Sequence, residues 1–233
     1  HNLCLGQMSS IGSGSDMPLK NGTMAPRYTP YQIKHRTEVA GMMTFLHGDD
    51  RIYNNIFIQN WPVKPLEVKE DMGFIMMDNQ VQGTSVFDDF PTYDEWIIPF
   101  ELDNEEPNMF VMQDYHFGKL PVWINGNAYF NGAKAWKNEK DCLINEKDSV
   151  YVKLLEKDGN YILDTNVYEI LGKYKTSMIN SDILGEAFEP EERFENPDGS
   201  TIVFNRDYFG NERGLTVIPG PFANPECVSN KLL

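Results

Sequence analysis

Three short segments of this sequence share one pattern, and that pattern limits what the chain can fold into. Each has a polar residue or glycine, then Asn, then three residues of β-like character; they are residues 1–5 (HNLCL), 54–58 (NNIFI) and 126–130 (GNAYF). Asn tolerates the left-handed backbone needed for a sharp turn between strands, and the residues that follow would point alternately to the two faces of a sheet. Such a repeat is typical of a solenoid, whose coils bury their inward residues by stacking on their neighbours. We therefore predict an all-β chain in which Asn2, Asn55 and Asn127 lie at corresponding corners of neighbouring coils.

Long insertions must separate these coils, because the intervals between the segments exceed the roughly 20 to 30 residues of a bare coil. Residues 12–29 are rich in Gly, Ser, Pro and Asn and predict an irregular excursion, after which residues 39–46 become strand-like. Within a later insertion, Thr92 and Glu95 have the spacing of a capping box, which predicts a short helix that Pro99 limits.

The pattern changes beyond Lys137. Residues 150–154 alternate with period two, residues 161–163 are again β-like, and an Asp-Gly pair lies between them, so we predict an antiparallel hairpin. Residues 190–222 are dense in Pro, Gly and aromatic side chains, and we expect them to cover coil edges that would otherwise pair with another chain.

We therefore divide the chain into two parts. Residues 1–138 hold the coils with their insertions, and residues 139–233 form a β-rich extension that caps them. The chain begins at His1 within a strand-like stretch. We therefore expect a truncated or processed start, so the absence of a signal-like segment leaves export undecided.

The charge of the chain bears on its partners. A formal net charge of −15 would repel phosphate, which argues against nucleic acid and anionic membranes, whereas a neutral sugar is compatible. No apolar run approaches the ~20 residues of a membrane span, so we predict a soluble chain. The 3 cysteines are odd in number and widely spaced, which gives no disulfide framework or zinc site and favours a reducing compartment such as the cytoplasm.

Two stretches, residues 27–36 and 47–51, concentrate groups of the kind that hold sugars. Sugar hydroxyls need partners such as carboxylate and guanidinium, and the apolar ring face needs an aromatic surface. The residues that we single out for substrate binding are Arg27, Tyr28, Tyr31, His35, His47, Asp49, Asp50 and Arg51. If Asp49 and Asp50 lie on a strand, they point to opposite faces, so at most one can face a groove. Surface ion pairs and turns are the alternative interpretation.

The sequence contains no motif for a metal site, a nucleophilic serine or a nucleotide site. No two His residues have metal-ligand spacing, and there is no nucleophile elbow, phosphate loop or dinucleotide fingerprint, so we predict no metal and no cofactor. Trp61, Trp96, Trp123 and Trp136 could line a sugar groove, although core packing is the better interpretation for most of them.

Several longer segments, in order along the chain, resemble glycoside hydrolase family 120. The matching segments are residues 27–31, 39–44, 47–51, 53–57, 126–134, 194–199 and 207–210. The resemblance implies a right-handed parallel β-helix and a β-xylosidase that acts on xylo-oligosaccharides. It also implies that the two catalytic carboxylates are missing. In the family, the nucleophilic Asp lies in a Trp-Leu-Asp-Trp stretch and the acid/base Glu in a Val-Glu-Val-Asn-His-Gly stretch. This sequence contains neither stretch.

We therefore expect the carboxyl-terminal part of a retaining glycosidase, inactive alone and without a catalytic residue of its own. Equivalent positions on successive coils are about 4.8 Å apart, and carboxyls about 5 to 5.5 Å apart favour retention. The two candidate stretches would form part of the substrate wall. A non-catalytic carbohydrate-binding or structural β-helix segment is the alternative, and a polysaccharide lyase is a weaker one, suggested only by residues 49–51. Homo-oligomerisation stays open.

Overall fold

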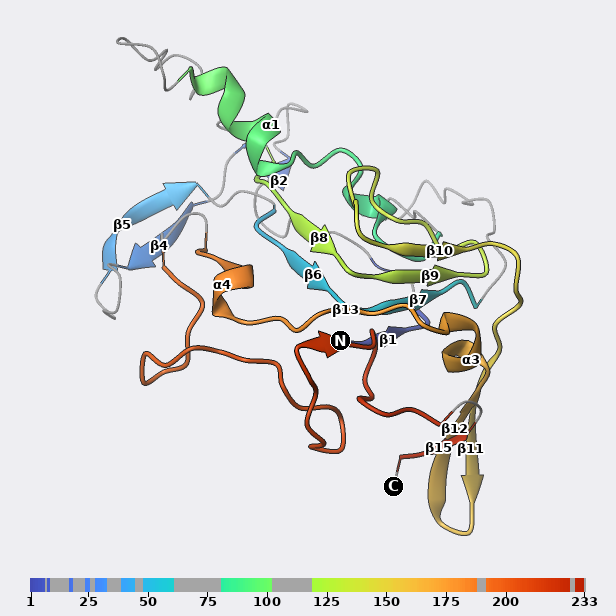
Figure 1. The fold of residues 1–233 in the computed structure, drawn as a ribbon. Coiled ribbons are helices and arrows are strands. Elements are labelled where there is room, and N and C mark those ends of the chain that lie inside the picture. Colours follow the sequence, from blue (N-terminus) through green and yellow to red (C-terminus); the bar gives the residue numbers. More distant parts are fainter. Residues whose placement is uncertain are drawn as a thin grey trace.

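A computed structural model describes residues 1–6, 8, 17–18, 24–25, 28–32, 39–44, 48–60, 81–101, 119–187, 192–226 and 229–232. Strands dominate this part of the chain and helices are few and short, so the protein is all-β (Figure 1). None of the helices in the described ranges is long and apolar enough to cross a membrane.

Two parallel sheets form the centre of the molecule. The first has the strand order β1-β7-β9-β10, with β1 at Leu3–Cys4, β7 at Ile56–Ile58, β9 at Ala128–Phe130 and β10 at Leu143–Asn145. The second pairs β6 (Arg51–Tyr53) with β8 (Trp123–Asn125), and it lies beside the first (Figure 1). Because β6 runs into β7 and β8 runs into β9, each pair of strands makes one bent rung. The described strands of these two sheets are not closed into a continuous coil.

Three asparagines stack where the rungs bend, as the sequence predicts. The main-chain N and Nδ2 of Asn2 both donate to Oδ1 of Asn55 at 2.9 Å, and the same two atoms of Asn55 donate to Oδ1 of Asn127 at 2.9 and 3.0 Å. We call Asn2, Asn55 and Asn127 the Asn ladder. Each rung is thereby tied to the next in one register.

The backbone reason given for these asparagines was wrong. Among the described residues, positive φ falls one position earlier, on Asn54 (56°) and Gly126 (72°), and not on Asn55 or Asn127. The residue before the ladder therefore makes the turn. The ladder asparagine supplies the hydrogen bonds between rungs.

Both faces of the first sheet are buried at β7 and β9, which explains why these two strands are continuous apolar runs. On one face, Ile56 and Phe130 pack against α3 (Val167–Leu171). On the other, the rings of Phe57 and Tyr129 stack with centroids 5.3 Å apart. Burying each such side chain contributes about 1.5–3 kcal/mol.

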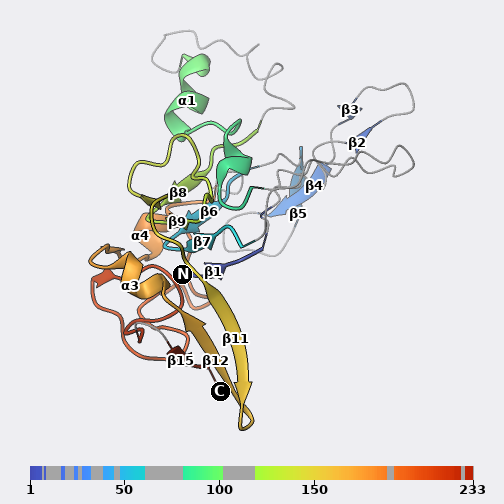
Figure 2. The same ribbon diagram turned by 90° about the vertical axis from the view of Figure 1, so that its right-hand side faces the viewer.

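The predicted hairpin is confirmed. β11 (Val152–Lys157) pairs antiparallel with β12 (Asn160–Thr165), and Asp158 and Gly159 both have positive φ, as a type I′ turn requires. β15 (Ser229–Lys231) adds a third strand on β12. The hairpin extends away from the two parallel sheets (Figure 2).

The predicted helix start is also confirmed. Thr92 caps α1 (Tyr93–Ile97) in a capping box with Glu95. Pro99 does not stop the helical path directly, because it lies inside a 3-10 turn, η2 (Ile98–Phe100), that extends α1. Proline has no N–H, so Pro99 cannot continue the hydrogen bonds of α1, and the chain goes on for one tighter turn only.

The first insertion is more ordered than the sequence predicts. Residues 12–29 were expected to be irregular, yet β2 (Met17–Pro18) pairs with β3 (Met24–Ala25). The strand-like stretch expected at residues 39–46 is confirmed by β5 (Val39–Thr44), which pairs antiparallel with β4 (Tyr28–Gln32). The remaining short elements are η1 (Ser85–Phe87), α4 (Ser181–Leu184), and β13 (Thr176–Ser177) paired with β14 (Thr216–Val217). Within residues 192–226, Gly220 donates its N–H to Asn54 O, so this segment lies against the bend of a rung.

Candidate functional site

The outer face of the β6–β8 sheet presents aromatic and polar side chains in a fixed register. Arg51 pairs with Trp123, and Tyr53 pairs with Asn125. Ile52 between them packs inward against the apolar core, so the neighbouring side chains point outward.

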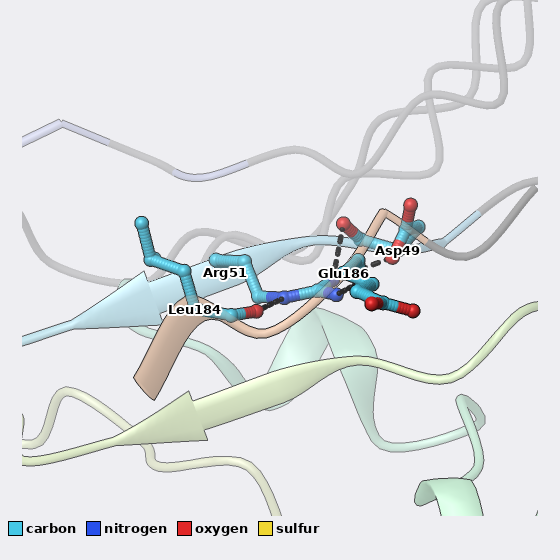
Figure 3. Close-up of polar contacts among 4 residues, drawn as sticks. All are labelled: Asp49, Arg51, Leu184 and Glu186. Atoms are coloured by element: carbon cyan, nitrogen blue, oxygen red, sulfur yellow. Dashed lines mark hydrogen bonds and ion pairs between the residues drawn. The ribbon is translucent and has the colours of Figure 1, made fainter. Parts of the chain in front are cut away.

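The guanidinium of Arg51 joins three parts of the chain (Figure 3). Its Nε donates to Leu184 O at 2.9 Å, its Nη2 donates to Glu186 O at 2.7 Å, and its Nη1 donates to both the carbonyl and Oδ1 of Asp49, at 2.8 and 2.5 Å. The same group lies 3.5 Å from the centroid of the Trp123 ring. The side chain is only 7% exposed. Arg51 therefore ties the end of α4 to β6, and its donors are used within the protein.

The two aspartates before Arg51 have different surroundings. Asp49 has φ of 62°, and both Asp49 and Asp50 precede the strand, so the condition under which they would point to opposite faces of a sheet is not met. The Asp49 carboxylate is held by Arg51. Asp50 is half-buried, and burial, followed by the nearby charge of Asp49, raises the pKa of its carboxyl, while Arg51 acts in the opposite direction. Asp50 thus keeps its proton to higher pH than an exposed aspartate.

The other predicted binding residues are placed only in part. Arg27, His35 and His47 lie outside the described residues. Tyr28 and Tyr31 belong to β4, so the backbone there is a strand and not the loop that we expected. The structure brings together Asp49, Asp50 and Arg51.

Three hollows border this face, and Tyr53 lines all of them. The first has a volume of about 250 Å³ and lies among residues of β1, β6 and α4, with His1, Cys4, Arg51 and Phe204 in its wall. The other two, of about 660 and 470 Å³, lie over the outer faces of Tyr53 and Asn125. Sequence reasoning missed Tyr53; its spacing of two residues from Arg51 on a short strand was the available signal.

The tryptophans divide between surface and core. Trp123 is half-buried and lines one hollow, whereas Trp136 is 4% exposed and belongs to the core cluster with Phe87 and Phe90. In the described ranges, no group of three or more His, Cys, Asp or Glu side chains could hold a metal ion.

Comparison with known proteins gives one informative match. No family model matches the sequence. No curated protein matches it either. A solved structure, that of XylC in complex with xylose, is similar in fold with a TM-score of 0.72 and 27% sequence identity. The similarity covers 100% of this chain and 32% of the XylC chain, so this chain spans about a third of the length of that protein.

Proposed function

We propose that this chain is part of a retaining glycoside hydrolase that acts on xylo-oligosaccharides, a β-xylosidase of the family 120 type. The observation that carries the proposal is the similarity in fold, along the whole chain, to a protein whose structure was solved with xylose. The segments that resemble family 120 include β6, β7 and β9, which form the rungs on either side of the Asn ladder.

The fold that goes with this proposal is a right-handed parallel β-helix. Its support is the two parallel sheets, the rungs that bend at equivalent positions, and the Asn ladder. We retain residues 1–138 as the coils and residues 139–233 as the capping extension. β10, from the second of these parts, continues the first sheet by pairing with β9.

The bond-breaking carboxylates are proposed to lie on other rungs of a longer protein. Neighbouring strands are about 4.8 Å apart, which would place two carboxyls on successive rungs near the roughly 5 to 5.5 Å typical of retention. One would attack the anomeric carbon, and the other would protonate the leaving oxygen. On this proposal the 233-residue chain is inactive alone.

The corner at Asp49, Asp50 and Arg51 is proposed as part of the substrate wall, together with Arg27, Tyr28, Tyr31, His35 and His47. The contacts of Arg51 suit a positioning role, because its donors hold Asp49 and the end of α4. Asp50 is the carboxyl better suited to a sugar hydroxyl, which can both donate and accept.

Kinetics of variants in the longest open reading frame that contains this chain test the wall. We expect Asp50→Ala and His47→Ala to lower kcat/KM for an aryl β-xyloside by about tenfold or more, the cost of a lost hydrogen bond to a charged group. Asp158→Asn, in the hairpin turn, is the matched control and should leave both constants unchanged. Wild-type constants for Asp50→Ala and His47→Ala together would overturn the proposed wall.

The second candidate is a non-catalytic carbohydrate-binding or structural segment. The half-buried aromatic side chains of Tyr53 and Trp123 beside open hollows favour it over the lyase alternative. In-frame sequence upstream of His1 that encodes the two carboxylate stretches would decide for the enzyme. A calcium-dependent rise in absorbance from unsaturated products would instead support a lyase.

A further inference from the structure

The two larger hollows over the β6–β8 sheet adjoin each other. They have volumes of about 660 and 470 Å³ and share five lining residues, Tyr53, Asn125, Lys140, Asp141 and Ile183. We call this the β6–β8 groove. Its dimensions are those of a ligand site, for which about 300–1,000 Å³ is typical.

Aromatic rings occur along the length of the groove. Tyr93 and Trp123 line one hollow, Tyr174 lines the other, and Tyr53 lies between them. Tyr93 is 47% exposed, on the first turn of α1. Arg51 covers part of the Trp123 ring and holds it in place. Rings held in this way offer flat apolar surfaces to a ligand that has an apolar face.

The charges that line the groove cancel, although the chain is strongly acidic. Lys140 and Lys175 are matched by Asp94 and Asp141, whereas the whole chain has a formal net charge of −15. Local neutrality with many hydrogen-bonding groups suits an uncharged polar ligand. A polyanion would gain nothing here and would be repelled by the rest of the protein.

Polar side chains shared by the two hollows can meet the hydroxyls of such a ligand. Asn125, Lys140 and Asp141 line both hollows, and together they offer amide, ammonium and carboxylate groups. Sugar hydroxyls both donate and accept, so one kind of ligand can bind all three groups.

We infer that the β6–β8 groove binds a neutral oligosaccharide, with pyranose rings on Tyr93 and Tyr53 and hydroxyls on Asn125, Lys140 and Asp141. The assignment rests on the chemistry of the lining and not on the proposed hydrolysis. The two proposals can therefore fail separately. The longer protein can hydrolyse xylosides although the groove binds no sugar, and the groove can bind sugar although no hydrolysis occurs.

Isothermal titration of the protein with xylohexaose, cellohexaose and polygalacturonate tests the inference. We expect heat of binding with a neutral hexasaccharide and none with the anionic polymer. Tyr93→Ala removes an exposed ring, and Ile183→Trp, at a 39% exposed position shared by both hollows, fills the groove. Each should weaken binding at least tenfold. Tyr161→Ala, on the hairpin and 40% exposed, is the matched control and should bind as the wild type does.

Two results would overturn the inference: no binding of either neutral hexasaccharide, or equal affinity for Tyr93→Ala and the wild type. If Ile183→Trp fails to fold, Tyr93→Ala alone decides, because its ring is not part of a buried cluster. In the longer reading frame, Tyr161→Ala should keep the wild-type rate on an aryl xyloside. Absence of aryl xyloside hydrolysis in every variant would count against the proposed function and not against the groove.

Discussion

The side-chain oxygen of Asn127 accepts two hydrogen bonds from Asn55, a residue 72 positions earlier in the chain. The same relationship, one rung away, joins Asn55 to Asn2. Long insertions therefore do not disturb the register of the rungs, because the ladder fixes it at the bend. Glu139 ends the ladder, where its Oε1 accepts from the main-chain N and Nδ2 of Asn127 at 3.2 and 2.9 Å.

Replacing the middle of the ladder should be costly. Asn55→Ala leaves both donors of Asn2 without their acceptor and removes one of the two donors to Oδ1 of Asn127, which keeps the main-chain N of residue 55; Asn55 is 5% exposed. We expect a loss of about 2–4 kcal/mol in the free energy of unfolding, measured by urea denaturation. Asn205→Ala, at an exposed position, is the control and should change stability by less than about 0.5 kcal/mol. Equal stabilities of the two variants would contradict a structural role for the ladder.

Glu139 should give the fold a specific pH dependence. Burial raises the pKa of its carboxyl, against hydrogen bonds from Tyr129 and Asn127 that act in the opposite direction. Because the folded pKa is above the unfolded value of about 4.3, its stabilising contribution is complete below that pH and is lost as the pH rises through the folded pKa. Glu139→Gln should remove this decline, so its stability relative to wild type should increase as the pH rises above the unfolded pKa of about 4.3.

The exposed Glu146→Gln is the control for that experiment, since its carboxylate forms only a surface ion pair with Lys134. Denaturation midpoints measured across the pH range would show parallel curves for Glu146→Gln and the wild type. Parallel curves for Glu139→Gln as well would refute the assigned pKa direction.

Replacing Arg51 with lysine should lower the stability of the protein. A single ammonium cannot reach Asp49, Leu184 O and Glu186 O together or lie flat on Trp123, so Arg51→Lys should cost about 2–3 kcal/mol. Amide hydrogen exchange in residues 181–187 should become faster. Arg193→Lys, which changes an exposed ion pair with Asp182, should cost less than about 1 kcal/mol. Unchanged exchange in Arg51→Lys would mean that α4 is held by other contacts.

A side chain at Gly126 should lower the stability of the protein more than one at Gly132. It has φ of 72°, and a Cβ there would lie 2.3 Å from Oδ1 of Asn54, whose Nδ2 donates to Ser177 O. Gly132 also has positive φ, but a Cβ there meets open space. Both alanine variants carry backbone strain, and Gly126→Ala should cost about 2 kcal/mol more in thermal or urea unfolding. A similar cost for both would show that Asn54 moves freely.

The rungs could be predicted from the sequence because their pattern is local. Residues 54–58 and 126–130 each carry the turn, the ladder asparagine and the buried strand within five positions, and the Asp-Gly hairpin is equally local. The groove could not be predicted in this way. Its walls come from α1, β6, β8 and residues 174–183, and only the fold brings these segments together. The hydrogen bonds from Arg51 to the backbone carbonyls of Leu184 and Glu186 could not be predicted from the sequence either.

Hydrolysis of 4-nitrophenyl β-xyloside, compared between this chain and the longest open reading frame that contains it, tests the central claim most directly. We predict release of nitrophenol by the longer protein alone, with β-xylose as the first product seen by proton NMR. No xyloside hydrolysis by the longer protein, or equal activity in the 233-residue chain, would contradict the account.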